Sequence, residues 1–449
     1  MKRPFLPLGL AIATALAGLF IARAMGKPPG PFSWTTYQLS PENNAVIRRS
    51  HWVANWRLRL KGKVNGALSI VGNAIYVDTL NGYLYSIDAE NGHPNWIAAL
   101  PNTAMNAPLV DRGVVIVGTG TAQHIIGHAM LGRPGGDVIE AFRAGDGSPL
   151  WSFKTVGEDM PTGVLMKSAN DHPILVEANG DGHAYGLDPF TGRLLWRTPL
   201  PGSDWMSSLT EQGGHVVGVV SSASLTRYWA ALKRRDFGYF KRHSWTYALA
   251  PSTGKILWMT HYGNADGSAT ASRSLIFVEG DYPVNTTNSL IENSVAALDG
   301  KTGRTVWSYD EAPGNHPGHA SAESSIAGVY DRGVLYQAFP WTAKFAAFRG
   351  TTGRRLWAIS VQHAIKMSAL VLNDKVFVGD TGGDFYVLNA KTGRVLNIVK
   401  FPHSFSCAPP LIVGETLFVT NGPNLYAIPL HALETIRHLQ GSEAVRGSR

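Results

Sequence analysis

The sequence predicts an all-β protein in which one four-stranded unit repeats around a closed ring. Three features predict this fold class: charged residues make up only 16% of the 449-residue chain, glycine occurs 49 times, and aromatic residues are plentiful, with 13 Trp, 15 Tyr and 17 Phe. Typical soluble domains have about 25% charged residues and about 7% glycine. This composition argues against coiled coils and disordered chains, and it favours many short strands joined by tight turns.

Seven segments share one pattern: a β-rich run leads through Asp, or an equivalent residue, to a turn ending in Gly and then to a strand that closes on Trp. The Asp side chain can accept backbone N–H bonds in the turn, and the glycine supplies the positive φ of the hairpin. Trp buries a large apolar face and keeps an N–H to donate, which suits a position between two sheets. The segments are 85–96, 141–151, 185–196, 247–258, 297–307, 347–357 and 386–397, the last of which lacks the Trp.

The number of blades follows from the two ends of the repeat region. A strand pair precedes each segment, as in 69–77 and 369–378, so each repeat has the four strands of one propeller blade. Trp56 closes a strand that has no turn before it, and 411–429 makes three strands that have no closing Trp. We therefore expect an eight-bladed β-propeller of four-stranded antiparallel blades, closed by pairing of N- and C-terminal strands.

The N-terminus predicts export. Lys2 and Arg3 precede an apolar run over 5–22, and Ala22-Arg23-Ala24 offers a cleavage site, as in a secretory signal peptide. The run is also long enough to span a bilayer as an anchor. The expected parts are a signal peptide or membrane anchor over 1–24, a linker over 25–50, the propeller over 51–433 and a flexible basic tail over 434–449. The protein is then periplasmic, either soluble after cleavage or tethered to the inner membrane by residues 5–22.

Charge and cysteine content narrow the possible partners and sites. The net charge of +8 and the pI near 9.4 are compatible with nucleic acid, anionic lipid or an anionic substrate. The low number of carboxylates also fits a protein that works in acid, where paired carboxylates lose their charge. The single cysteine, Cys407, excludes an internal disulfide and a multi-cysteine metal site.

The Asp-x-x-Thr-Gly-x-x-x-Trp unit resembles the repeat of pyrroloquinoline-quinone-type (PQQ-type) propellers, and the resemblance runs from about Trp56 to Pro429. One branch is the propeller lipoprotein of the outer-membrane β-barrel assembly machine, although this chain lacks the lipid-anchor cysteine. A second is the PQQ-dependent dehydrogenases, similar around 151–163, which often have a cysteine pair that is absent here. A third is tetrathionate hydrolase, an exported enzyme of acidophiles, which the low charge and high pI fit.

Candidate ligand-binding residues are those expected to line the axial funnel, where the chain enters each innermost strand. The entry residues are Asn106, Thr162, Ser207, Ser268, Ser321 with Glu323, Lys366 with Ser368, and Ser406 with Cys407. Their small polar side chains are compatible with a cofactor or an anion, or with a simple hydrated channel. We expect Lys366, Trp205, Thr162 and Asn106 to bind a cofactor, with Lys366 as the cation for an anionic group and Trp205 as a stacking surface.

Candidate catalytic residues are Glu323, Asp266 and His319. His316, His319 and Glu323 lie in the loop 315–323 and can supply an acid, a base or metal ligands, although such a loop fixes no ligand spacing. Asp204 and Asp266 are possible bases, or the oxygen ligands that a calcium bound with PQQ needs; turn-capping is their alternative role. PQQ with calcium is thus a possible cofactor, and no metal site is assigned.

The insertion 226–243 is the expected partner-binding segment, because it interleaves six Lys/Arg with aromatic residues. Export makes nucleic acid an unlikely partner class, so an envelope protein or an anionic membrane surface is expected. The expected contact residues are Arg227, Trp229, Arg234, Phe237 and Tyr239. The favoured function is a protein-interaction scaffold in the cell envelope; the alternatives are a PQQ-dependent dehydrogenase of the periplasm and a tetrathionate hydrolase-like enzyme.

Overall fold

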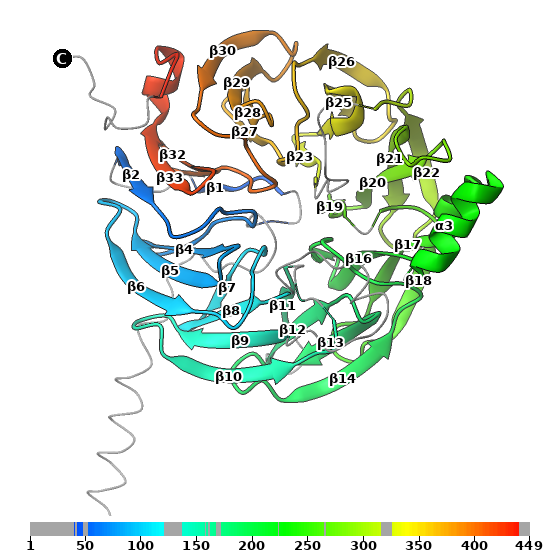
Figure 1. The fold of residues 1–449 in the computed structure, drawn as a ribbon, viewed down its shortest axis with the longest axis horizontal. Helices are drawn as coiled ribbons and strands as arrows, with labels where there is room; N and C mark the ends of the chain where they lie inside the picture. The colour runs from blue at the N-terminus through cyan, green and yellow to red at the C-terminus, as the bar shows by residue number, and fades with distance from the viewer. Residues whose placement is uncertain are drawn as a thin grey trace, which may run out of the picture.

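Eight β-sheets surround a central axis in the computed structural model, as Figure 1 shows. The structure describes residues 40, 43–47, 53–120, 137–157, 159, 162–167, 172–222, 224–264, 266–315 and 326–439. No helix in these ranges is long and apolar enough to cross a membrane. The segment 5–22, expected to be a signal peptide or an anchor, lies outside the described residues.

Seven blades each contain four consecutive antiparallel strands. Blade 1 contains β3 (Ser69–Val71), β4 (Ala74–Thr79), β5 (Tyr83–Asp88) and β6 (Pro94–Ala99). Blade 2 contains β7 (Leu109–Asp111), β8 (Val114–Gly118), β9 (Val138–Arg143) and β10 (Pro149–Lys154). Blade 3 contains β11 (Val164–Lys167), β12 (Pro173–Ala178), β13 (His183–Leu187) and β14 (Leu194–Pro199). Blade 4 contains β15 (Thr210–Gln212), β16 (His215–Ser221), β17 (Ser244–Leu249) and β18 (Ile256–Thr260).

The second half of the ring repeats the arrangement. Blade 5 contains β19 (Thr270–Ala271), β20 (Leu275–Pro283), β21 (Ile291–Asp299) and β22 (Thr305–Asp310). Blade 6 contains β23 (Val329–Asp331), β24 (Val334–Phe339), β25 (Lys344–Arg349) and β26 (Arg355–Ser360), with the short 3-10 helix η2 (Pro340–Thr342) between β24 and β25. Blade 7 contains β27 (Leu370–Leu372), β28 (Lys375–Gly379), β29 (Asp384–Asn389) and β30 (Val395–Lys400).

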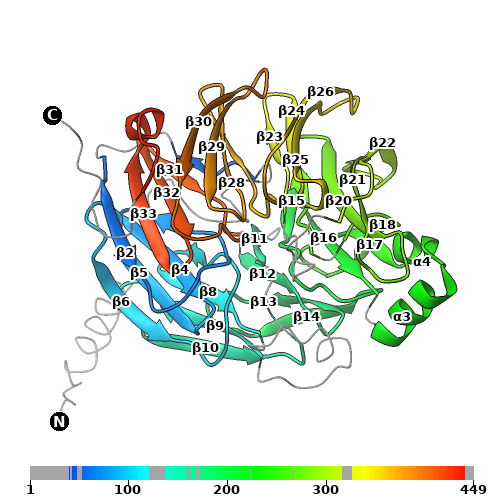
Figure 2. The same ribbon diagram turned by 45° about the horizontal axis from the view of Figure 1, so that its top comes forward.

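Blade 8 joins the two ends of the propeller, as predicted. Its C-terminal strands are β31 (Leu411–Val413), β32 (Thr416–Asn421) and β33 (Asn424–Pro429), and β2 (Trp56–Arg59) pairs antiparallel with β33. An additional strand, β1 (Val46–Ile47), pairs parallel with β31 on the inner edge and lies within the range expected to be a linker. The 3-10 helix η3 (Leu430–Glu434) follows β33. In Figure 2 β2 and β33 lie side by side in this blade.

A Trp–Gly contact joins each blade to the next. The Trp at the outer strand donates its indole N–H to a carbonyl in the next blade's turn, at 2.8 to 3.3 Å, from Trp56 through Trp357. Its ring covers the positive-φ glycine of that turn. In the seventh repeat Asn397 replaces Trp and donates to the carbonyls of Leu433, at 2.6 Å, and Ile436, at 3.0 Å. The last joint is therefore made to η3 and the chain that follows it.

Any other residue in place of the glycine at this joint would bring its Cβ against the Trp ring. Gly303 has φ of +70°, and a Cβ there would lie 2.3 Å from the Cε3 atom of Trp258. We expect Gly303→Ala to lower the free energy of unfolding by about 2–4 kcal/mol, because backbone strain and overpacking add. Gly72→Ala is the matched control: φ is +61°, but nothing lies within 4 Å of its Cβ position. Urea unfolding measures both, and equal losses would contradict a role for the Trp contact.

Candidate functional site

A cavity of about 180 Å³ lies between the insertion of blade 4 and the loops of blades 5 and 6. The insertion forms two helices between β16 and β17, α3 (Leu225–Arg234) and α4 (Gly238–Arg242). Figure 1 shows α3 at the rim of the disc, outside the ring of strands. The cavity wall is mainly aromatic and hydroxylic, with acidic groups, and the lining residues are Trp205, Ser221, Ser222, Tyr228, Trp229, Phe240, His243, Ser244, Asn264, Asp266, Asp281, Pro283, Asn288, Ile291 and Trp341.

The cavity brings together three residues that the sequence suggested for separate roles. Trp205 was expected to stack on a cofactor, Asp266 to act in catalysis and Trp229 to contact a partner, and all three line this cavity. Sequence reasoning missed His243 and Trp341, which no repeat or motif distinguishes. It also missed Asp281, for which a signal existed. Acidic residues alternate with Gly in the otherwise apolar strand β20, which reads Leu-Ile-Phe-Val-Glu-Gly-Asp-Tyr-Pro.

The helices are held in place by a small cluster of their own. The Ser224 side chain caps α3 by accepting the Arg227 backbone N–H, at 3.3 Å. The buried cluster comprises Ala231, Leu232, Tyr239, Phe240 and Tyr282, the last from β20. The strands β20 and β21 have nine residues each, longer than those of the other blades, and they support the insertion.

Two polar contacts tie the insertion to this long hairpin. Lys241 forms an ion pair with Glu292, at 2.9 Å, and the Tyr228 hydroxyl donates to Asn288 Oδ1, also at 2.9 Å. Of the residues expected to bind a partner, Tyr239 is buried and Phe237 is half-buried. These two side chains attach the helices to the protein itself, so they do not offer an exposed contact. Arg227, Trp229 and Arg234 are exposed.

Asp281 is fixed in the cavity wall by two donors. Its carboxylate accepts the indole N–H of Trp341, at 3.1 Å, and the side-chain amide N–H of Asn293. Asn293 in turn accepts the backbone N–H of Trp341, at 3.1 Å. The three residues come from β20, β21 and η2, so the hairpin of blade 5 and the loop of blade 6 position this carboxylate together.

Two fully buried carboxyl groups are coupled to the cavity acids. Asp204 uses one oxygen to accept the Ser207 N–H, at 3.0 Å, and its other oxygen has no partner in the described structure. Both oxygens of Glu279 are buried without a partner there. Burial raises the pKa of both groups well above their usual range, and repulsion from Asp266 adds to the effect in both. Asp281 raises the pKa of Glu279 further.

The series of buried acids continues into blade 3. Burial raises the pKa of Glu177 and of Asp159 well above their usual range. Asp159 repels the charged form of Glu177, and Glu177 repels that of Asp204. A set of acids with raised pKa beside a cleft is typical of a functional site. The raised pKa values keep the buried members protonated at a pH where free carboxyl groups are charged, so the arrangement can hold protons beside the cavity.

Several residues expected at the axial funnel form hydrogen bonds at the boundaries between blades, while Asn106 Oδ1 and Ser207 Oγ are buried without a partner in the described structure. Thr162 Oγ1 accepts the Ala107 N–H, at 2.6 Å, and Asn106 donates to the carbonyls of Gly118, at 2.8 Å, and Asp159, at 3.2 Å. Other hydroxyls make similar contacts between blades, in the pairs Thr162–Ser208, Ser208–Ser268, Ala327–Ser368 and Val64–Ser406. Small hydroxylic residues at these positions thus have a structural explanation.

The other predicted residues are not brought to the cavity. Lys366 is half-buried before β27 in blade 7 and does not line the cavity, and Cys407 is buried. Glu323, His316 and His319 lie outside the described residues. Of the three expected catalytic residues, the structure places Asp266 at the cavity, and Glu323 and His319 lie outside the described residues.

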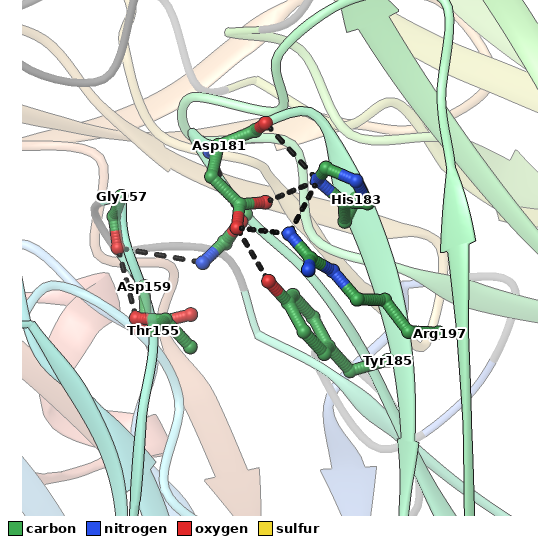
Figure 3. Close-up of polar contacts among 8 residues, drawn as sticks. Thr155, Gly157, Asp159, Asp181, His183, Tyr185 and Arg197 are labelled. Atoms are coloured by element: carbon green, nitrogen blue, oxygen red, sulfur yellow. Dashed lines mark hydrogen bonds and ion pairs between the residues drawn. The ribbon is translucent and has the colours of Figure 1, made fainter. Parts of the chain in front are cut away.

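A second polar network surrounds Asp181, which lies in the turn between β12 and β13 of blade 3 (Figure 3). Asp181 interacts with His183 Nδ1, at 3.2 Å, with the Arg197 guanidinium, at 3.5 Å, and with the Tyr185 hydroxyl, which donates to it.

In blade 7, His363, Asp380 and Asp384 lie close enough to share a metal ion. Asp380 there already accepts the N–H groups of Gly382 and Asp384 and the Tyr386 hydroxyl, and Asp384 pairs with Lys400. Most carboxylate oxygens of both groups are paired internally, as in structural ion-pair networks, whereas His363 Nδ1 is buried 3.6 Å from Asp380 and has no hydrogen-bond partner in the described structure.

The charged groups in and near the cavity indicate whether PQQ with calcium fits there. The unpartnered carboxyl oxygens of Asp204 and Glu279 are the kind of ligand that calcium prefers. PQQ itself carries carboxylates, which need cations. None of the lining residues in the described ranges is Lys or Arg. The described residues therefore do not fit PQQ in this cavity.

The comparisons with known proteins agree with the repeat and the ring. A family model described as outer membrane protein assembly factor BamB matches residues 52–223, 241–371 and 346–433. Tetrathionate hydrolase of Acidithiobacillus ferrooxidans is 26% identical over 395 residues, which is 82% of this chain and 73% of the relative. Quinohemoprotein alcohol dehydrogenase ADH IIB of Pseudomonas putida is 28% identical over 226 residues, 48% of this chain and 29% of that protein.

A solved structure supports the fold. BamB from Moraxella catarrhalis superposes with a TM-score of 0.57 at 14% identity, over 84% of this chain and 98% of the BamB chain. The family match covers all eight blades apart from β1 and residues 224–240 of the insertion, and the sequence pattern, the eight blades and the closure by both ends all agree with it. The chain belongs to the PQQ-type propeller family whose model is described as outer membrane protein assembly factor BamB.

Proposed function

We propose that the protein is an exported hydrolase of the tetrathionate hydrolase type, which works in acid with Asp266 as its acid–base group. The observation that carries the proposal is Asp266 in an aromatic cavity, coupled to the buried acids Asp204 and Glu279. The similarity to a tetrathionate hydrolase over 82% of this chain supports the same reaction class.

The cavity suits the sulfur chain of tetrathionate, a dianion with a sulfonate at each end. As for the PQQ carboxylates, no lining Lys or Arg in the described ranges pairs with these sulfonates. Sulfur is soft and polarisable and contacts aromatic rings favourably, and Trp205, Trp229 and Trp341 offer such rings. In acid the protonated carboxyl groups carry no charge that would repel the substrate, and they are hydrogen-bond donors. In the proposed step water attacks an inner sulfur and forms an S–O bond, and the ionised Asp266 carboxylate accepts the water proton. Thiosulfate leaves with the electron pair of the central S–S bond, and the other half of tetrathionate becomes HO–S–SO3−.

A second candidate function is a protein-interaction scaffold in the cell envelope. The family match over residues 52–223 and 241–433 favours it, and so does the exposed basic face of α3, which lies in the unmatched segment 224–240. A scaffold needs neither the acidic cavity nor turnover. The two functions are therefore separated by whether a cavity residue controls a reaction.

We expect the purified protein to consume tetrathionate between about pH 2 and pH 5, and we expect Asp266→Asn to lower kcat at least a hundredfold, the range of general acid–base catalysis. Loss of tetrathionate and release of acid measure the reaction. Asp236→Asn is the control, because Asp236 is an exposed acid of the same insertion that does not line the cavity. A folded wild-type protein without activity would exclude the hydrolase and leave the scaffold.

The buried acids also predict how stability depends on pH. Since burial raises the pKa of Glu279 above its unfolded value, the folded protein keeps a proton that the unfolded chain has released. This contribution is complete below about pH 4. It is lost as pH rises towards the folded pKa, by up to about 1.4 kcal/mol per pH unit. We expect Tm to fall from pH 4 to pH 7.

The fall in Tm is expected to be smaller in Glu279→Gln, which has no proton to lose. Glu90→Gln, at an exposed turn residue, is the control and keeps the wild-type slope. Thermal unfolding followed by circular dichroism at several pH values measures the slopes. Identical slopes in wild type and Glu279→Gln would contradict the assignment of a buried, protonated Glu279.

A further inference from the structure

The outer face of α3 combines an exposed Trp with an excess of positive charge. Trp229 is 47% exposed, although it lies in the middle of a helix. Arg227, Lys233, Arg234 and Arg235 are exposed on α3 and its C-cap. The buried side chains Ala231 and Leu232 point the opposite way, into the cluster that holds the insertion.

The cations on this face differ from those of α4 in their ion pairs. Lys241 is paired with Glu292 and Arg242 with Asp236. Within the ranges that the structure describes, no ion pair is formed by Arg227, Lys233, Arg234 or Arg235. Neighbouring like charges that lack acidic partners repel one another, so an external anion would relieve this repulsion.

Helix electrostatics explain only part of this charge. The negative end of the helix dipole favours cations in the last turn, where Lys233 and Arg234 lie. The same dipole disfavours Arg227 in the first turn, where α3 has no acidic residue. The dipole gives no reason for the exposed Trp229. A ligand that attracts both cations and an indole ring explains all of them.

We propose that the outer face of α3 binds an anionic lipid surface. Trp favours the interface between water and a bilayer, and basic residues on an amphipathic helix are attracted by anionic headgroups. The helix protrudes at the rim of the disc in Figures 1 and 2, so a flat surface reaches it without meeting the blades. Because Trp229 also lines the cavity, binding places the cavity beside the membrane surface. This inference stands independently of the proposed reaction.

The test uses the full chain and vesicles added to the folded protein. We expect it to sediment with vesicles of phosphatidylglycerol and phosphatidylcholine more than with phosphatidylcholine alone, and this difference to shrink at high salt. Lys233→Ala, Arg234→Ala and Arg235→Ala combined should weaken binding to the anionic vesicles by roughly tenfold or more. Trp229→Ala should weaken it several-fold.

The control removes the same charge from another surface. Arg193→Ala, Arg304→Ala and Arg354→Ala combined change exposed residues in the turns between the third and fourth strands of three blades. These turns lie at the opposite ends of the sheets from the connection that holds α3. We expect this variant to bind like the wild type, with an unchanged Tm in both triple variants.

Three results would overturn the proposal. Wild-type protein that binds both kinds of vesicle equally would exclude an anionic site. An equal loss in both triple variants would show that net charge, and not α3, controls binding. Unchanged vesicle binding in the α3 variant, with a lower kcat/KM for tetrathionate, would assign these cations to substrate capture instead. The first two results are independent of whether the wild type hydrolyses tetrathionate.

Discussion

The contact between an indole ring and a glycine turn is the constraint on which the ring depends. Seven Trp residues, from Trp56 to Trp357, each donate to a carbonyl of the next blade and cover its positive-φ glycine. Each joint sets the spacing of two neighbouring sheets, so the same contact repeated around the axis fixes the curvature. The eighth joint uses Asn397 and the segment after β33, because the ring closes there on the end of the chain.

This constraint acts at one end of the sheets and leaves the other end open to variation. The Trp–Gly joints involve the turns between third and fourth strands, where repeats are nearly identical in length. The connection between β16 and β17 lies at the opposite end and holds two helices, and β20 and β21 extend beyond their counterparts. The cavity forms between these two departures from the repeat, so its position follows from where the blades differ.

The difference between the repeated joints and the connections that depart from the repeat explains what could be predicted from the sequence. The fold, the eight blades and the closure by both termini follow from a periodic pattern, and the structure confirms them. The cavity joins loops of three blades, and no period relates Trp205, Trp229 and Asp266, so their proximity could not be predicted. Asn106 and Thr162 were selected because small polar residues suit a funnel, but the same chemistry suits hydrogen bonds between blades. Asp281 and Glu279 were visible as acids in an apolar strand, yet only the fold shows that Asp266 and Asp281 both lie close enough to repel the charged form of Glu279.

The hydrogen bonds between blades and the buried carboxyl groups respond differently to acid, and this difference connects the fold with the proposed function. The joints between blades use indole N–H groups and backbone carbonyls, which do not titrate, so ring closure is insensitive to pH. Asp204, Glu279 and Glu177 do titrate, and burying their charged forms costs stability, most of all for Glu279, neither of whose oxygens has a partner in the described structure. In acid they are neutral and that cost disappears. A propeller held together by uncharged contacts can therefore retain a group of buried acids, provided that it works where they are protonated.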